Sequence, residues 1–469
     1  MIRILVFGTG DIYQHYKNLL KEQIICFIDN DETKIGKYID GKLIVSPEKG
    51  IKYQYERIYI LSVYYREMKE QLIRLGVDSD IIYNPLEVKK ILKDRYNKSS
   101  MKSSCKHLYN PISTNKEKIL FLTPDLNYNG ALVALFAAMR SCLEAGFDVI
   151  VGAMQSGNAK DFLINSLQVK IVVDPYIVLS TMDEMDWVDK FDIVICNTVL
   201  FSDFLYKRNF DTKVIWWLHD PKYIYENINR DLLKKINFTN LLVYAAGEVA
   251  KQTFIEYSHY CNVEVLLFGL DDRKDFNKLE KTVSKRNFTF LTAGNIQNWK
   301  GQDLFAEAAA KTIDWMRDNS EEEEIDFIIV GNDNNGFANA LKSKYHEYPQ
   351  IKFIGARTHD YLMDKYSDID VYCCTSRQET MSITSVEAMM MERTCIVSSA
   401  AGIAEYISDG IDGMIFESEN VDSLVSKMLW CINNKNKIST MGVKARNIFV
   451  ENFSYPKFSE KFLDIVKNM

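Results

Sequence analysis

Short apolar runs alternate with amphipathic stretches along most of the chain, and this rhythm restarts twice. Between residues 117 and 271 the runs typical of buried strands are KILFLT, DVIVGA, IVVD, FDIVICN, KVIWWLHD and LLVYAAG. In residues 272–469 they are FTFLTAGN, DFIIVGND, IKFIG, DVYCCTS and TCIVSS. Apolar strands that alternate with helices favour parallel sheets covered on both faces. We therefore predict two doubly wound α/β units, with a ligand site at the carboxyl ends of their strands.

Residues 1–95 predict a smaller α/β unit, with strands in IRILVF, IICFI and RIYILS. Gly8, Gly10 and Asp29 are spaced as in a dinucleotide-binding loop. The third glycine position holds Tyr13, whose ring would crowd both the helix–strand packing and an approaching diphosphate. We therefore favour an accessory or dimerising domain over a cofactor-binding one, and we leave ligand binding by this unit open.

A polar segment, residues 96–116, reads YNKSSMKSSCKHLYNPISTNK and predicts a linker. Seven cations lie between Lys89 and Lys106, against Asp94 as the one acid. Such a stretch is compatible with peripheral contact to an anionic membrane surface. A solvated linker is the interpretation that we favour.

The composition and net charge of the chain argue against some classes of function. The chain has 469 residues, 47% of them hydrophobic and 26% charged, which is ordinary for a globular protein of about three domains. The net charge of −7 argues against nucleic acid as a partner, because neutralising phosphates needs a basic face. Nine scattered cysteines without a paired framework predict reduced core thiols and a cytoplasmic location, and nothing reads as a membrane span.

The most informative stretch is Ser376–Phe416, SRQETMSITSVEAMMMERTCIVSSAAGIAEYISDGIDGMIF. Glu379 and Glu387 lie eight positions apart, the first in a predicted loop and the second in the opening turns of the helix that contains SVEAMMM. Backbone N–H groups at a helix N-terminus attract anions, and the flanking carboxylates can accept hydrogen bonds from sugar hydroxyls. The pattern therefore predicts a site for a sugar joined to a diphosphate.

This pattern resembles the Glu-x7-Glu motif of the family 4 glycosyltransferases, retaining enzymes of GT-B fold that use nucleotide-sugar donors. Ala401-Gly402-Ile403-Ala404-Glu405 and Asp409-Gly410-Ile411-Asp412-Gly413 resemble the family's downstream glycine motifs, and the resemblance covers about residues 117–469. It implies that Glu387 binds the ribose and Glu379 the donor sugar. The backbone amides of Thr380, Met381 and Ser382 would line the sugar and the phosphates.

A second loop resembles the family's diphosphate-binding sequence, Gly-Arg-x4-Lys-Gly. In Gly294-Asn295-Ile296-Gln297-Asn298-Trp299-Lys300-Gly301, Lys300 takes the position of the lysine and Asn295 that of the arginine. The asparagine removes a charge-assisted contact. Either Arg377 supplies the missing charge or the diphosphate binds more weakly.

Three further residues are candidates on the strength of the resemblance. His219 follows the predicted strand KVIWWL, where the family commonly has a histidine that acts on the donor sugar or the transition state. Gly130 opens the first long helix, where donor or acceptor could approach the backbone. Arg357 follows the strand IKFIG, in the loop that cradles the nucleobase in the family. Gly269-Leu270-Asp271 matches a motif that we interpret as structural.

Two Asp-x-Asp sequences, Asp29-Asn30-Asp31 and Asp368-Ile369-Asp370, spell the metal motif of the other large glycosyltransferase fold. We interpret them as turn or strand-cap acids, because a lysine and a helix N-terminus can stabilise a leaving diphosphate without a metal. No metal site and no cofactor are predicted; the donor is a nucleotide sugar, with a UDP-sugar favoured over a GDP-sugar.

The sequence thus predicts a retaining glycosyltransferase of cell-surface polysaccharide synthesis, with a glycan or lipid-linked acceptor. Two alternatives stay open. One is a non-catalytic GT-B partner subunit, which the substitution at Asn295 allows. The other is a dinucleotide-dependent enzyme that works through residues 1–95. An oligomer is compatible with the sequence.

Overall fold

The computed structural model describes the chain except for residues 63, 97–115, 174–176, 178–187, 275–286 and 322–323. The predicted linker therefore lies almost wholly outside the described residues. The described chain divides into two compact units: residues 1–245, 251–264 and 463–469, and residues 246–250 and 265–462. The last helix, α18 (Tyr455–Asn468), begins in the second unit and ends in the first.

The first unit contains an N-terminal six-stranded sheet of order β3-β4-β2-β1-β5-β6. Its strands are β1 (Arg3–Phe7), β2 (Gln23–Ile28), β3 (Tyr38–Ile39), β4 (Lys42–Val45), β5 (Arg57–Ile60) and β6 (Ile82–Tyr83). Its helices are α1 (Asp11–Tyr16), α2 (Pro47–Gly50), α3 (Tyr65–Arg74) and α4 (Pro85–Tyr96). The sheet is parallel except for β3, which pairs antiparallel with β4.

Tyr13 is a core residue of this sheet domain. Its ring packs edge-on against Phe27, with 4.7 Å between the centroids, and its hydroxyl donates a hydrogen bond to Asp40 at 2.7 Å. Asp29, the acid of the dinucleotide-like spacing, accepts from the Thr9 hydroxyl and from Lys34, at 2.7 and 3.0 Å. The dinucleotide-like positions are thus engaged by the domain's own side chains.

The same unit holds a seven-stranded sheet of order β13-β12-β11-β10-β7-β8-β9. Its strands are β7 (Lys118–Asp125), β8 (Asp148–Gln155), β9 (Lys170–Val173), β10 (Ile193–Cys196), β11 (Lys213–Leu218), β12 (Leu241–Ala245) and β13 (Glu264–Val265). Its helices are α6 (Gly130–Glu144), α7 (Lys160–Asn165), α8 (Ser202–Tyr206), α9 (Lys222–Tyr225), α10 (Arg230–Leu233) and α11 (Glu248–Ser258), the start of α11 being grouped with the second unit. Both sides of the central strands are buried, as their continuous apolar sequences predict.

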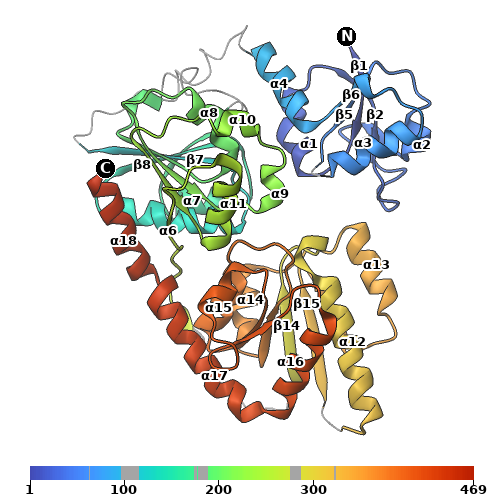
Figure 1. The fold of residues 1–469 in the computed structure, drawn as a ribbon, viewed down its shortest axis with the longest axis vertical. Coiled ribbons are helices and arrows are strands. Elements are labelled where there is room, and N and C mark those ends of the chain that lie inside the picture. Colours follow the sequence, from blue (N-terminus) through green and yellow to red (C-terminus); the bar gives the residue numbers. More distant parts are fainter. Residues whose placement is uncertain (63, 97–115, 174–176, 178–187, 275–286, 322–323) are drawn as a thin grey trace. The chain divides into compact units, whose positions relative to one another are not determined.

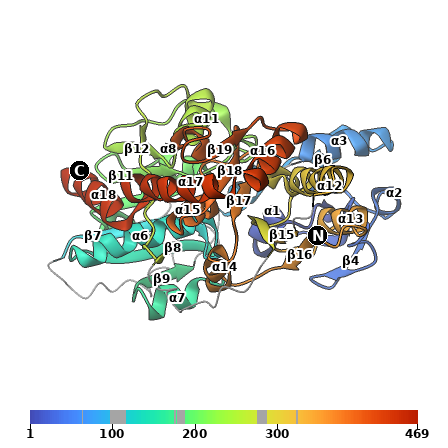
Figure 2. The ribbon, with the colours of Figure 1, turned by 90° about the horizontal axis from the view of Figure 1, so that it is seen from below.

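The second unit is built on a parallel six-stranded sheet of order β16-β15-β14-β17-β18-β19. Its strands are β14 (Phe288–Ala293), β15 (Ile325–Val330), β16 (Ile351–Gly355), β17 (Val371–Cys374), β18 (Thr394–Ser398) and β19 (Met414–Phe416). Its helices are α12 (Gln302–Asp318), α13 (Gly336–Lys344), α14 (His359–Tyr366), α15 (Ile383–Met390), α16 (Val421–Asn433) and α17 (Lys435–Ile448). In Figures 1 and 2, α12 and α13 lie on one side of this sheet and α14 and α15 on the other.

Two chain segments of the second unit pair beside α18. Leu270 forms a parallel bridge with Ser454, and a Cβ atom on Gly269 would lie 2.5 Å from Cβ of Phe458. This close packing of Gly269 and Leu270 agrees with the structural interpretation of the Gly269-Leu270-Asp271 motif.

Most of the described cysteines are free and buried, as predicted, but Cys261 is exposed. The expectation that the thiols lie in the core is therefore wrong for this one, which follows α11 at the surface. Among the residues with assigned positions, none of the helices is long and apolar enough to cross a membrane.

Candidate donor-binding site

The sheet of the second unit extends to both sides of its strand β14. Strands β15 and β16 follow on one side, and β17, β18 and β19 on the other, so that the strand order reverses between β14 and β17. Open parallel sheets bind their ligands at the carboxyl ends of the strands beside such a switch. A pocket opens there, lined by Thr292, Ala293, Lys300, Gln302, Tyr372, Cys374, Thr375, Ser376, Glu379, Ser382 and Thr384. The lining includes three of the predicted site residues: Lys300, Glu379 and Ser382.

The loop between β14 and α12 holds Lys300 against the end of β17. Gly301 adopts the left-handed region with φ 67°, and a Cβ atom there would lie 1.9 Å from the carbonyl oxygen of Thr375. The buried amide of Gln302 donates to the carbonyls of Gly294 and Asn295, at 3.4 and 3.1 Å, and accepts from the Gln297 N–H. No sequence signal marks Gln302, because a glutamine at the start of a helix does not show that its side chain turns inward.

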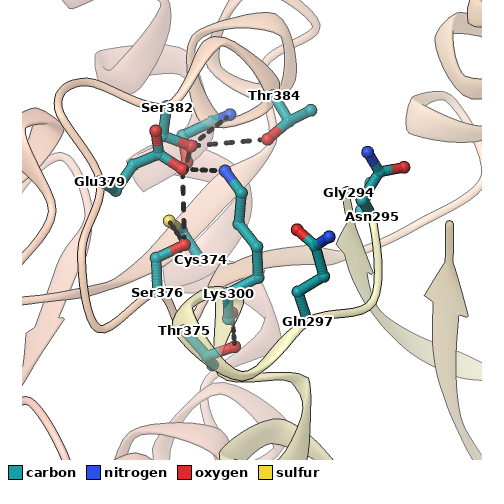
Figure 3. A network of polar contacts seen from close by, with 12 residues as sticks. Gly294, Asn295, Gln297, Lys300, Cys374, Thr375, Ser376, Glu379, Ser382 and Thr384 are labelled. Carbon is teal, nitrogen blue, oxygen red and sulfur yellow. Dashed lines mark hydrogen bonds and ion pairs between the residues drawn. The ribbon is translucent and has the colours of Figure 1, made fainter. Parts of the chain in front are cut away.

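Lys300 and Glu379 form an ion pair inside this pocket (Figure 3), with Nζ donating to Oε2. Glu379 also accepts from the Ser376 hydroxyl at 3.5 Å. Burial works to lower the pKa of Lys300, but the charge of Glu379 and the hydrogen bond to it raise that pKa above its ordinary value. The ammonium is therefore charged at neutral pH, and it is held by the carboxylate expected to contact the donor sugar.

Hydrogen bonds from the downstream glycine motif hold the backbone of the loop that carries Glu379. Gly402 N–H donates to the carbonyl of Glu379 at 3.0 Å, and Ile403 N–H donates to the carbonyl of Met381 at 3.1 Å. In a trans peptide the carbonyl and the following N–H point in opposite directions. The amides of Thr380 and Ser382 therefore point away from the Gly402 segment, while the Met381 side chain is buried.

Helix α15 begins at Ser382, which occupies the left-handed region with φ 87° and caps the N–H of Ser385 at 3.4 Å. A non-glycine residue in that region costs about 1–3 kcal/mol. Replacing a serine cap with glycine costs only a few tenths of a kcal/mol, and the greater freedom of glycine in the unfolded chain offsets about 0.4–1 kcal/mol. We expect Ser382→Gly to stabilise the ligand-free protein by about 0.5–1 kcal/mol, seen as a melting temperature raised by about 2 °C.

Ser382→Ala is the matched control for this prediction, since it removes the cap and keeps the strained backbone. It should lower the melting temperature. If the Ser382→Gly variant melted below the wild type, the Ser382 backbone would carry no strain to release.

Glu387, the second predicted carboxylate, lies in α15 with a side chain only 5% exposed. Oε1 accepts from Nε2 of His359 at 2.7 Å, and Oε2 accepts from the buried Tyr366 hydroxyl at 3.2 Å. Tyr366 also donates to the carbonyl of Thr384, and Tyr372 donates to the Thr384 hydroxyl at 2.6 Å. Side chains of α14 and β17 thus hold the first turn of α15 and the carboxylate that it presents.

The guanidinium of Arg377 pairs with two carboxylates of the protein itself. It makes a two-pronged pair with Asp303, at 2.7 and 2.8 Å, and Nε donates to Glu419 at 2.7 Å. In this arrangement it joins the start of α12 to a surface loop and does not line the pocket. The structure thus gives no support to the expectation that Arg377 replaces the family's arginine charge.

Two further predicted residues lie on exposed loops of this unit. Asn295 is exposed and lies apart from the Lys300–Glu379 pair in Figure 3. Arg357 donates to the carbonyl of Ala356, and its guanidinium lies 5.6 Å from the centroid of the Tyr361 ring. Neither lines the pocket, so donor contacts by these two side chains remain predictions.

The first unit presents its candidates at the carboxyl ends of its own strands. His219 directly follows β11, with its ring 4.5 Å from that of Trp217, and burial lowers its pKa to about 3, so the imidazole is neutral. Its neighbour Asp220 accepts from the Thr198 hydroxyl at 2.6 Å and from the Val199 N–H at 2.7 Å. Gly130 is the first residue of α6, where it is exposed behind the Asn129 cap.

The Asp-x-Asp acids have turn and strand-cap partners. Asp31 accepts from the Thr33 N–H and hydroxyl, and Asp370 accepts from the Thr289 N–H at 2.8 Å, where β17 joins β14. Over the described ranges, no group of three or more His, Cys, Asp or Glu side chains is arranged to hold a metal ion.

Comparison with known proteins agrees with this geometry. Residues 287–434, which contain the whole pocket, match the family described as Glycosyl transferases group 1. Residues 1–83 match the family described as C2185-like, N-terminal. The resemblance to glycosyltransferases is thereby confirmed at the level of a group 1 domain.

Curated relatives are similar over part of their length. The UDP-Gal:alpha-D-GlcNAc-diphosphoundecaprenol alpha-1,3-galactosyltransferase of Escherichia coli is 28% identical over 190 residues, 39% of this chain and 47% of its own. The poly(ribitol-phosphate) alpha-N-acetylglucosaminyltransferase of Staphylococcus aureus (strain COL) is 27% identical over 99 residues, 21% of this chain and 20% of its own. The chain spans 20% to 62% of the length of the curated relatives that it matches.

Solved structures cover more of the chain. Anabaena Alr3699/HepE, in complex with UDP and glucose, has a TM-score of 0.62 at 18% identity and covers 75% of this chain and 100% of its own. WaaG, a glycosyltransferase involved in lipopolysaccharide biosynthesis, has a TM-score of 0.58 at 14% identity and covers 74% of this chain and 99% of its own. At these identities the likeness shows the fold alone. The protein thus has the predicted α/β GT-B fold with an additional N-terminal sheet domain, and its residues 287–434 match a group 1 glycosyltransferase domain.

Proposed function

We propose that the protein is a retaining glycosyltransferase that moves a sugar from a nucleotide-sugar donor to a glycan or lipid-linked acceptor. The observation that carries the proposal is the Lys300–Glu379 pair in a pocket at the switch point of a group 1 domain. A cation and an acid side by side match the two halves of such a donor. One half is an anionic diphosphate, and the other is a sugar rich in hydroxyl donors.

In the proposed mechanism Lys300 binds the diphosphate and stabilises the negative charge that develops as the nucleoside diphosphate leaves. Glu379 accepts hydrogen bonds from the donor sugar, and the Thr380 and Ser382 amides donate to the sugar and phosphates. Glu387 accepts from the ribose hydroxyls. Both carboxylates of the proposed site thus bind hydroxyl groups, and neither is assigned as a nucleophile. The acceptor therefore attacks the donor sugar on the face from which the diphosphate departs.

The finer assignments belong to the same proposal. A UDP-sugar is favoured as donor, since the Escherichia coli relative is named for UDP-Gal and Anabaena Alr3699/HepE was solved with UDP. An acceptor in cell-surface polysaccharide synthesis, at the inner face of the membrane, fits the diphosphoundecaprenol and poly(ribitol-phosphate) in the names of the relatives. We propose residues 117–271 as the acceptor domain, with His219 at its active face and Gly130 near a substrate, and residues 272–469 as the donor domain.

The first test is a thermal-shift screen against UDP, GDP, ADP, CMP, NAD and their sugar conjugates, with and without EDTA. We expect a rise in melting temperature with one nucleotide class, unaffected by EDTA and abolished in Glu387→Ala, because ligands that bind only the folded state stabilise it. A response to NAD alone would move the function to residues 1–95. A stable protein that responds to none of the nucleotides would contradict the proposal.

A further inference from the structure

A histidine outside the Glu-x7-Glu motif contacts Glu387, the second carboxylate of that motif. His359 is the first residue of α14, and its Nε2 lies 2.7 Å from Oε1 of Glu387. The exposed fractions of the two side chains differ widely, at 52% for His359 and 5% for Glu387. His359 therefore stands between a buried carboxylate and the solvent from which a ligand would arrive.

The backbone at His359 is held by the cap of its own helix. The Thr358 hydroxyl accepts the N–H of Tyr361 and caps α14, so that His359 enters the first turn with a set direction. A positive charge in that turn is disfavoured by the helix dipole. The hydrogen bond to Glu387 nevertheless raises the pKa of His359 above its ordinary value, against a smaller lowering by burial. The carboxylate thus outweighs the opposing effects of burial, of the Arg273 charge and of the helix dipole.

The charged groups around the pair are few among the described residues. Arg273, which follows the Gly269-Leu270-Asp271 motif, donates to Asp360 at 3.1 Å, so that the charges of these two offset each other. Tyr366 contacts Glu387 from the far end of α14, and burial raises the pKa of its hydroxyl, which stays protonated. Of these side chains His359 is the imidazole, the group whose ordinary pKa lies nearest neutrality, and Glu387 raises that pKa.

We propose that His359 is a positioning residue of the nucleoside subsite, which fixes Glu387 for the ribose hydroxyls and adds positive charge where an anionic nucleotide binds. The inference rests on the proposed function, because it takes Glu387 to be the ribose ligand. A carboxylate has about four lone-pair sites. His359 and Tyr366 occupy one on each oxygen and leave the others for the ribose.

The pH dependence follows from the charge of the pair. With His359 protonated, the pair is neutral overall; after deprotonation it carries one negative charge beside the site of an anionic ligand. Nucleotide affinity should therefore be full below the raised pKa of His359 and fall as the pH rises through it. The expected loss is about fivefold, the size of one charge–charge interaction at about 4 Å in well-solvated surroundings.

The experiment is calorimetric titration with UDP-glucose, whose diphosphate keeps its charge between about pH 6 and pH 9. Wild type is compared with His359→Ala, His359→Gln and His346→Gln. Glutamine can still donate to Glu387 without titrating, whereas His346 is an exposed histidine that hydrogen-bonds Ser343 at the end of α13. We expect His359→Ala to bind about tenfold more weakly at low pH. His359→Gln should bind with a pH-independent affinity, and His346→Gln should behave as wild type.

Separate outcomes address the two proposals. Wild-type affinity and an unchanged pH profile in His359→Ala would overturn the role of His359 and leave the proposed function intact. A wild-type protein that binds none of the nucleotides in the thermal-shift screen would end the proposed function, and this inference with it. Loss of binding in His359→Ala without rescue by glutamine, at an unchanged melting temperature, would contradict the positioning role, because the retained hydrogen bond should restore binding.

Discussion

Replacing Glu379 with glutamine is expected to tighten the binding of a free nucleoside diphosphate while slowing sugar transfer by a hundredfold or more. Without ligand, Glu379 holds the Lys300 ammonium in an ion pair, and the diphosphate has to displace that carboxylate. Glutamine removes the competing charge, so we expect UDP to bind several-fold more tightly. Transfer loses the charge of the acceptor for the sugar hydroxyls, since a neutral amide oxygen accepts more weakly than a carboxylate. Losses of about 10²–10³ are typical for one group that acts on a transition state.

The measurement pairs UDP titration with steady-state transfer kinetics. Asp422→Asn is the matched control, because Asp422 forms a lysine–carboxylate pair with Lys311 on an exposed surface away from the pocket. That variant should keep both the affinity for UDP and the rate. If the glutamine variant bound UDP no better than wild type, the ion pair would not be what the diphosphate displaces.

Much of the fold could be predicted from the sequence because its strands are buried on both faces. Continuous apolar runs such as KILFLT and FTFLTA match β7 and β14 closely. The two loops that carry the candidate site residues are marked by sequence motifs and not by apolar runs. Glu379, Lys300 and Ser382 lie in short motifs whose spacing is visible in a single chain, and the pocket brings these three together.

Other features of the site depend on partners that are distant in sequence. Lys300 and Glu379 are 79 positions apart, and nothing in either motif says that they form an ion pair without ligand. Arg377 lies just before the motif, yet it is drawn away by Asp303 and Glu419. The roles of His359 and Gln302 come from where α14 and α12 begin, and no motif marks them. Such tertiary pairings follow from packing that a local pattern does not encode.

Replacing Lys300 with alanine is expected to lower kcat by about 10²–10³ and to change the donor KM much less. The backbone beside Lys300 is held before the start of α12 by the close approach of Gly301 to Thr375, and Glu379 holds the ammonium, so the cation is already in place before the reaction. A preorganised cation stabilises the charge that develops on the leaving diphosphate more than the charge already present in the donor. Steady-state kinetics of the purified variant measure the two effects separately.

The double variant Lys300→Ala with Glu379→Gln decides whether the two side chains act as a unit. Residues that share one interaction show strongly non-additive losses. Lys300→Ala alone leaves a largely buried carboxylate facing the phosphates without its counter-charge, so part of its loss is repulsion by Glu379. We therefore expect the double variant to be slower than wild type by much less than the product of the two single losses. Full additivity would mean that lysine and glutamate act on the donor independently, and that their pairing without ligand has no part in catalysis.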